Sequence, residues 1–306
     1  MNVIGFDTSN YTTSIAYFNG FDGINCSKLL PVKAGELGLR QSDAVFHHTK
    51  SLQELSGRLF SDIQPESIAA VGVSTQPRAV KGSYMPCFMV GITQAKLLSD
   101  ALHVPLFEFS HQQGHVAASA WSANRMDILD MPHLAWHLSG GTTELLLVEP
   151  QGKNVSCTRI GGTTDISAGQ LIDRTGLMLD LPFPAGKHLD FLSKDAEKED
   201  YFRIKCPDME FSLSGVQNKV QDYRLNNDPA ETAAYAIRSV CQAVYHASEN
   251  ATKHYPGLPI IFSGGVASNS TLREMLKPFQ PIFAPVQYST DNAMGIAVLT
   301  FRAQEG

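Results

Sequence analysis

Two segments about 130 residues apart share one pattern, and this pattern constrains the fold more than any other feature of the chain. GFDTSNYTTSIAYF (5–18) and HLSGGTTELLLVE (137–149) each combine a strand, a turn rich in Gly, Thr and Ser, and a returning strand. Two such hairpins predict a duplicated α/β fold in which each half offers a turn to the same ligand. Two polar hairpin turns also arise by chance, so other features must support the duplication.

Strand and helix patterns alternate along the rest of the chain. AAVGVST (69–75) and LPIIFSGG (258–265) are apolar runs that predict buried strands. Apolar residues recur at helical spacing from residue 88. Asp228, Pro229 and Glu231 predict the start of another helix with a capping box. The polar stretch from about 194 to 227 predicts a surface insertion.

Composition restricts the class of protein. With 306 residues, of which 43% are hydrophobic, the chain can form one large domain or two lobes. A net charge of −6 does not favour unaided binding to nucleic acid or to an anionic membrane. Five widely spaced cysteines without a CxxC motif indicate no disulfide framework. The N-terminus lacks signal-peptide features and no apolar run can span a bilayer, so we expect a soluble, cytoplasmic protein.

Three glycine turns follow or bound apolar strands. They are SGG (139–141), GG (161–162) and SGG (263–265). Glycine lets backbone N–H groups approach a phosphate closely, so three such turns predict a nucleotide cleft. Glycines also end strands for steric reasons alone. The chain has no Walker-type or Rossmann glycine motif, which disfavours those two phosphate-binding modes.

The segment HQQGH (111–115) resembles half of a metal site. Ser110 can cap a helix, and the i, i+4 spacing then puts His111 and His115 on one face. Asp291, in the polar turn STDNA (289–293), is a candidate third ligand. The alternative is a helix start with two ordinary histidines. Peptidase activity is disfavoured because no carboxylate between the histidines can serve as a base.

Two aspartates and two serines complete the candidate residues. Asp165 and Asp173 lie eight residues apart on a predicted helix, where carboxylates could hold ribose hydroxyls or magnesium. Both could equally be solvated surface residues. Ser212 and Ser214 lack a GxSxG elbow, so a hydrolase nucleophile is not indicated.

Seven motifs run nearly from end to end of the chain: GFDTSNYTTSIA, HQQGH, LSGGTTEL, DISAGQLIDRTGLMLDLPFPAG, FSLSG, SGGVASNSTLRE and STDNAMGIA. In content and order they resemble the universal tRNA threonylcarbamoyladenosine synthase family, also known as the glycoprotease family. The resemblance implies the two-lobed, duplicated fold of actin-like ATPases and sugar kinases (ASKHA). We accordingly expect an N-terminal lobe at 1–105 and a second lobe, with the metal- and adenylate-binding elements, at 106–306.

The resemblance also implies roles for individual residues. His111, His115 and Asp291 match the ligands of the family's iron or zinc ion. The residues that match the pocket for the adenylate are His137, Leu138, Ser139, Gly140, Gly141, Asp173, Gly186 and Asn269. The implied reaction transfers a threonylcarbamoyl group from threonylcarbamoyl-AMP to adenosine 37 of tRNA. The expected nucleotide ligand is ATP or threonylcarbamoyl-AMP, and magnesium is a further candidate cofactor. It needs no covalent enzyme intermediate, and we assign no catalytic side chain.

The chain departs from the family pattern at several positions. Tyr11-Thr12 replaces an acidic pair, Gln113 a glutamate, Thr142 a histidine, Gln217 a lysine, and Gln76-Pro77-Arg78 a Gly-Pro-Gly turn. Electrostatic groups at a transfer site contribute about 2–4 kcal/mol each, so these losses would slow the reaction greatly unless they are replaced. Two hypotheses follow: a divergent synthase, or a non-catalytic nucleotide-binding paralogue that pairs with a related protein. The expected partners are tRNA and helper proteins, such as a related paralogue or the threonylcarbamoyl-AMP synthase system. We expect no membrane association, and a homodimer is an alternative that the sequence leaves open.

Overall fold

The hairpin at the start of the chain opens the first of two sheets. In the computed structural model, which describes residues 1–9, 11–32, 39–61 and 63–305, this sheet has the order β3-β2-β1-β4-β5. Its strands are β1 (Asn2–Asp7), β2 (Thr12–Phe18), β3 (Gly23–Leu29), β4 (Ile68–Gln76) and β5 (Leu106–Ser110). β1, β2 and β3 pair antiparallel, whereas β4 is parallel to both β1 and β5.

The second sheet repeats this arrangement. Its order in the described residues is β11-β10-β6-β7-β8-β9. The strands are β6 (His133–Leu138), β7 (Thr143–Gln151), β8 (Asn154–Thr163), β9 (Glu210–Phe211), β10 (Ile260–Ser263) and β11 (Ile282–Phe283). β6, β7 and β8 pair antiparallel, and β10 is parallel to both β6 and β11. Apart from β9, the two sheets have the same topology, so the predicted duplication is confirmed.

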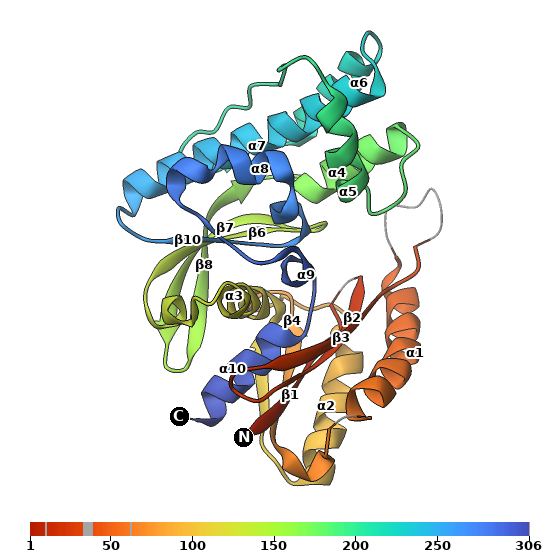
Figure 1. Cartoon of the computed structure of the whole chain (residues 1–306), viewed down its shortest axis with the longest axis vertical. Helices are drawn as coiled ribbons and strands as arrows, with labels where there is room; N and C mark the ends of the chain where they lie inside the picture. The colour runs from red at the N-terminus through yellow and green to blue at the C-terminus, as the bar shows by residue number, and fades with distance from the viewer. Residues whose placement is uncertain (10, 33–38, 62, 306) are drawn as a thin grey trace.

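Helices cover the sheets on their outer faces and fill the space between them (Figure 1). α1 (Gln41–Phe60) and α2 (Phe88–Leu102) pack on the first sheet. The second sheet is covered by the long α7 (Pro229–His254), with α4 (Ala168–Met178), α5 (Gly186–Leu192), α6 (Ser214–Arg224) and α8 (Ser270–Met275) around it. α3 (His111–Ser122), α9 (Val286–Ser289) and α10 (Met294–Gln304) lie between the sheets.

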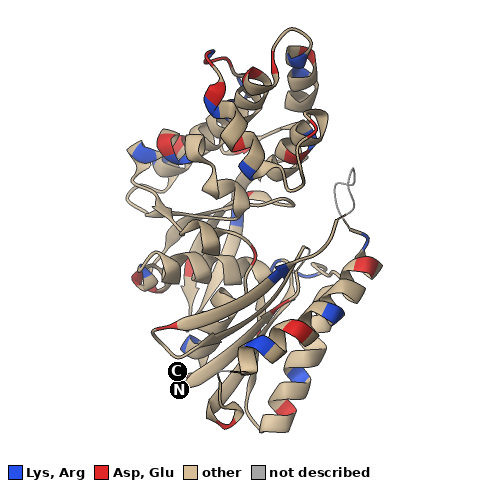
Figure 2. Cartoon of the chain, turned by 45° about the vertical axis from the view of Figure 1, so that its right-hand side comes forward, with Lys and Arg blue, Asp and Glu red and all other residues tan. Residues whose placement is uncertain are grey.

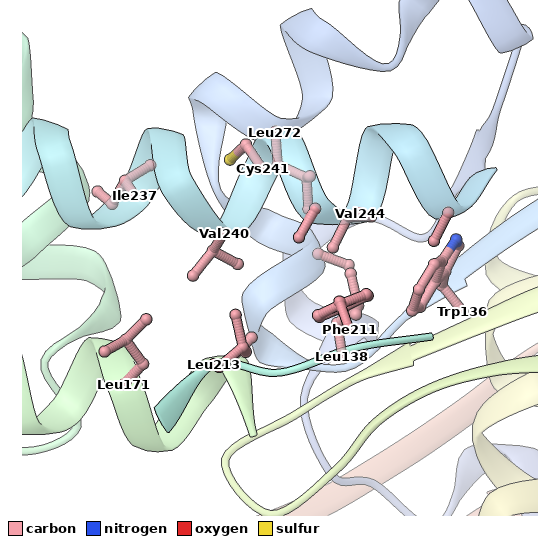
Figure 3. Close-up of a cluster of buried hydrophobic side chains, with 14 of the residues drawn as sticks. Trp136, Leu138, Leu171, Phe211, Leu213, Ile237, Val240, Cys241, Val244 and Leu272 are labelled. Atoms are coloured by element: carbon pink, nitrogen blue, oxygen red, sulfur yellow. The ribbon is translucent and has the colours of Figure 1, made fainter. Parts of the chain in front are cut away.

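The largest core joins α7 to the second sheet. Val240 and Val244 of α7 lie on the side of the helix that faces Phe211 and Trp136, and Ile237 belongs to the same cluster (Figure 3). These side chains are almost fully buried, and burial of each contributes about 1.5–3 kcal/mol. The indole N–H of Trp136 donates to Ser248 Oγ at 2.9 Å, so its polar atom is also satisfied. Along the described residues, we find no helix with the length and apolar character needed to cross a bilayer.

α3 and α10 approach each other through two glycines. A Cβ on Gly295 of α10 would lie 1.8 Å from the carbonyl oxygen of Gly114 of α3, so the contact requires glycine at residue 295. This close packing sets the distance between the start of α3, where His111 and His115 lie, and Asp291, three residues before α10. Gly114 of HQQGH therefore contributes its backbone carbonyl to a helix contact that the sequence motif alone does not reveal.

Two local predictions differ from the structure. The stretch 194–227 is not wholly a surface insertion, because β9 pairs with β8 and α6 buries Val216 and Val220 in the second core. Asp228 caps α7 as predicted, but the Glu231 carboxylate accepts hydrogen bonds from the backbone of 197–198 instead of closing a capping box. β5 belongs to the first sheet and α10 returns to pack on it. The lobe boundary after residue 105 stays a prediction.

Candidate metal and nucleotide site

The two histidines of HQQGH and Asp291 converge between the sheets. Ser110 caps α3 in a capping box with Gln113, so the helix begins at His111. His115 Nε2 lies 3.0 Å from His111 Nε2 and 3.2 Å from Asp291 Oδ1. The remaining separation, between His111 Nε2 and Asp291 Oδ1, is 3.6 Å. Residues 176 positions apart in sequence thus present three donor atoms to one point.

Metal coordination fits these distances. Ligand atoms about 2.1 Å from a tetrahedral ion lie about 3.4 Å from one another. The observed separations, 3.0, 3.2 and 3.6 Å, bracket this value. Two imidazoles and one carboxylate are also a donor set that zinc and iron accept.

A third imidazole completes the cluster. His137, at the end of β6, contributes a nitrogen that lies within 4.8 Å of the nitrogens of His111 and His115. Its ring is only 5% exposed, yet neither of its nitrogens has a hydrogen-bond partner among the described residues. Buried polar atoms without a partner are costly, so these two nitrogens point to a ligand. The sequence associated His137 with the adenylate; its position places it beside the predicted metal ligands as well.

Asp7 supports the cluster from behind. Its Oδ2 lies 2.7 Å from His111 Nδ1, and its Oδ1 accepts from the Ser9 N–H at 2.9 Å. This leaves His111 Nε2 facing Asp291, as in a metal-bound histidine oriented by a carboxylate. β1 and β5 both run parallel to β4, so Asp7 and His111 meet at the carboxyl edge of the sheet. Asp7 was not predicted as a site residue, although its position at the end of a strand was a usable signal.

Burial and the two nearby carboxylates shift the pKa values of the cluster in opposite directions. Burial opposes protonation of His111, but Asp7 and Asp291 outweigh it and raise the His111 pKa to about 10. Burial, followed by the charge on His111, lowers the pKa of His115. Burial would raise the pKa of Asp291, but His111 and His115 hold it well below its usual value. Asp7, which is buried, and Asp291, which is partly exposed, therefore place two carboxylates beside the histidines for a bound cation.

A cavity of about 610 Å³ opens beside the cluster, which is within the range of small-molecule sites. Of the predicted metal ligands, His111 and Asp291 line it, and so do His137, Ser139, Gly140, Gly141 and Asp173 of the predicted adenylate residues. Leu138, Gly186 and Asn269 are not among the described residues that line it. Leu138 packs into the second core (Figure 3), and Asn269 caps α8 while donating to Asp190 at 2.8 Å.

Residues at the start of α4 fix the position of the glycine turn at 139–142. Ser167 Oγ donates to the Gly140 carbonyl at 2.7 Å, and Gly169 of α4 packs so closely that a Cβ there would lie 2.5 Å from Gly140 Cα. None of the hydrogen bonds described for this turn uses the N–H groups of Gly140 or Gly141. These donors are therefore available to a phosphate, as in other backbone anion sites.

The predicted pairing of Asp165 with Asp173 is wrong. α4 begins at Ala168, so Asp165 lies before the helix and accepts hydrogen bonds from Ser212, Leu213 and Ser214 at the start of α6. Asp173 instead accepts from the Ala185 N–H at 2.8 Å. Burial raises the pKa of Asp173. Asp173 alone of the two remains at the cavity.

The residues that depart from the family pattern have structural roles here. Gln113 Oε1 accepts from the Ser110 N–H at 2.8 Å, and its Nε2 donates to the Val155 carbonyl at 2.7 Å. Arg78 pairs with Glu144 through two guanidinium nitrogens, at 3.0 and 2.8 Å. Gln217 Oε1 accepts from Arg174 Nη1 at 2.6 Å. Glu144 was not predicted as a site residue, because its partner Arg78 is distant in the chain.

Comparisons with known proteins agree on one family. The family model for tRNA N6-adenosine threonylcarbamoyltransferase (TsaD) matches residues 36–298. The protein of that name from Carboxydothermus hydrogenoformans is 34% identical over 263 residues, which cover 82% of this chain and 75% of the relative. Its counterpart from Lactococcus lactis subsp. cremoris (strain SK11) is 27% identical over 325 residues, covering 98% and 91%.

Solved structures support the fold. HypF from T. kodakarensis superposes with a TM-score of 0.64 at 12% identity, covering 100% of this chain and 48% of HypF. At this identity the likeness shows the fold alone. Together with the repeated sheet topology, it confirms the two-lobed actin-like ATPase and sugar-kinase architecture.

Proposed function

Because this chain belongs to the tRNA N6-adenosine threonylcarbamoyltransferase family, we propose that it transfers a threonylcarbamoyl group from threonylcarbamoyl-AMP to adenosine 37 of tRNA. The observation that carries the proposal is the convergence of His111, His115 and Asp291 beside the cavity that the 139–142 turn lines. A set of metal-ligand residues and a turn suited to phosphate lie on one cavity. This arrangement suits a reaction that activates a carbonyl next to a phosphate.

His111, His115 and Asp291 would hold one iron or zinc ion, with His137 as a fourth donor. When bound, the ion supplies Lewis acidity that polarises the carbonyl of the threonylcarbamoyl group. Asp7 fixes the tautomer of His111, so that His111 Nε2 faces the cluster. His115 and His137 are buried, and their low-dielectric surroundings strengthen each of these interactions.

The glycine turn and Asp173 would bind the adenylate. The N–H groups of Gly140 and Gly141 can donate to the phosphate oxygens, and the Asp173 carboxylate can accept from a ribose hydroxyl. The same pocket would admit ATP, with or without magnesium. The exocyclic amine of adenosine 37 attacks the carbamoyl carbon, the bond from that carbon to the phosphate oxygen breaks, and AMP leaves. The cavity contributes by holding the two reactants close together. The proton that the amine loses can pass to water.

Transfer to tRNA requires help from other proteins in this proposal. The chain has a net charge of −6, and acidic and basic residues alternate along α1 and mix over the other helices in view (Figure 2). Such a surface gives little attraction for a polyanion. We therefore propose that a partner, such as a related paralogue, supplies the basic surface.

The second candidate function is a non-catalytic nucleotide-binding subunit. It is favoured by Tyr11 and Thr142, two cavity residues that stand where the family has an acid and an imidazole. Both readings retain nucleotide binding and the fold. They differ in whether the chain alone restores the modified adenosine in a cell that lacks its own synthase.

Two experiments test the proposal. Metal analysis of the purified full chain should give roughly one iron or zinc per chain, lost in the His111→Ala/His115→Ala variant. The His188→Ala/His254→Ala variant, which removes two exposed histidines, is the matched control. Complementation then decides the activity: restored threonylcarbamoyladenosine supports the transferase, and its absence despite normal metal content supports the non-catalytic subunit. A metal-free, folded wild-type chain would refute the metal site.

A further inference from the structure

Two arginines line the cavity, and only one of them is neutralised. Arg78 directs Nε and Nη2 to Glu144, whose side chain is only 9% exposed and also accepts from Gln112 at 2.9 Å. The pair joins the loop after β4 to strand β7, and so links the two sheets. With its charge matched by a buried carboxylate, Arg78 is suited to hold the cavity wall and poorly suited to bind an anion.

Arg174 differs because its partner is neutral. Its Nη1 donates to Gln217 Oε1 at 2.6 Å, and no ion pair to it is found among the described residues. The neighbouring Asp173 turns to the Ala185 N–H and does not contact it. Nε and Nη2 of Arg174 have no acceptor within the described part of the chain. The guanidinium is thus oriented by an amide, keeps its full charge, and retains donors for a ligand.

We propose that Arg174 binds the phosphate of the nucleotide in this cavity, and that Gln217 is the residue that positions it. The inference rests on the proposed function only in taking the ligand to be an adenylate. A guanidinium offers parallel donors that match two phosphate oxygens. Arg174 is partly buried and lines the same cavity as the free N–H groups of Gly140 and Gly141, so the anion is a nucleotide phosphate and not the backbone of tRNA.

The test compares AMP with adenosine, which differ by the phosphate alone. Binding of each to the metal-loaded full chain is measured by calorimetry for the wild type and for Arg174→Gln, Arg174→Lys and Gln217→Ala. Arg174→Gln should weaken AMP binding by about tenfold to a hundredfold, because a charge-assisted hydrogen bond is lost, while adenosine binding stays unchanged. Arg174→Lys and Gln217→Ala should show smaller losses, again for AMP only.

Lys219→Gln is the matched control, since it removes one exposed positive charge from the same helix as Gln217. It should leave the ratio of AMP to adenosine affinity unchanged. Equal losses for AMP and adenosine in Arg174→Gln would mean a structural role and overturn the proposal. So would unchanged AMP affinity with weakened tRNA binding, which would place the contact on tRNA. Failure of threonylcarbamoyl transfer leaves this comparison intact, so the two proposals fail separately.

Discussion

The contact between α3 and α10 gives the sharpest prediction for how the site is built. In Gly295→Ala the new Cβ would lie 1.8 Å from the Gly114 carbonyl oxygen and 2.8 Å from the Ala118 nitrogen. Both atoms belong to the backbone of α3, so no side-chain rotation can relieve the overlap. The helices must separate, and the separation carries Asp291 away from His111 and His115.

The expected magnitude combines two opposing effects. Alanine in place of glycine stabilises a helix interior by about 0.5–1 kcal/mol. Overpacking a core costs about 1–3 kcal/mol, and a clash with backbone belongs at the upper end. We therefore expect Gly295→Ala to lower the free energy of unfolding by about 2 kcal/mol. Metal affinity should fall as well, because donor atoms now 3.0–3.6 Å apart would no longer share one ion.

Two other glycine-to-alanine variants serve as controls. In Gly114→Ala the nearest atom is Ile296 Cδ1 at 2.9 Å, the flexible end of a side chain, so the cost should be small. Gly57, within α1, has no atom within 4 Å of its Cβ position, so Gly57→Ala should stabilise by about 0.5–1 kcal/mol. Urea unfolding and metal analysis measure all three. Equal stability of Gly295→Ala and Gly114→Ala would refute the reasoning.

Three further predictions concern stability. Burial lowers the pKa of His48 to about 4. Neutral His48 therefore contributes up to about 3 kcal/mol to the free energy of unfolding above pH 6.5, and this contribution is lost as the pH falls toward 4. Urea unfolding across this range should show a weaker pH dependence for His48→Asn than for the wild type. Asp228→Ala removes the cap of α7 and should cost about 1 kcal/mol in the same assay, whereas Asp228→Asn should cost less. Glu144→Gln should lower the free energy of unfolding by about 1–2 kcal/mol. In a double-mutant cycle, the loss for Glu144→Gln/Arg78→Gln should be smaller than the sum of the two single losses. Additive losses would contradict a coupled pair.

Much of the fold was predictable because it rests on local patterns. A few neighbouring residues encode each of these features: the two similar hairpins, the apolar runs of β4 and β10, and the start of α7 at Asp228-Pro229. The site was predictable only in part. HQQGH fixes two imidazoles on one helical face, but its spacing does not single out Asp291, which was proposed as a third ligand from its polar turn and was supported by the family resemblance.

The remaining features depend on tertiary contacts that no local pattern specifies. Asp7 reaches His111 only because β1 and β5 flank β4, a strand order that the sequence does not state. Glu231 leaves its expected capping box because the backbone of 197–198 offers two donors to its carboxylate. Asp165 does not lie on α4 but accepts from the N–H of Ser214, 49 residues away at the start of α6. In each case a side chain met a partner far along the chain.

Gln113 shows that a departure from the family pattern need not disable the site. The third position of α3 must offer an acceptor to the Ser110 N–H, and an amide oxygen does so as a carboxylate would. The amide nitrogen also donates to the Val155 carbonyl, which a carboxylate could not do. The neutral residue therefore suits its surroundings and keeps the start of the metal-binding helix intact. Altered chemistry would therefore arise from Tyr11 and Thr142, which line the cavity, and not from HQQGH.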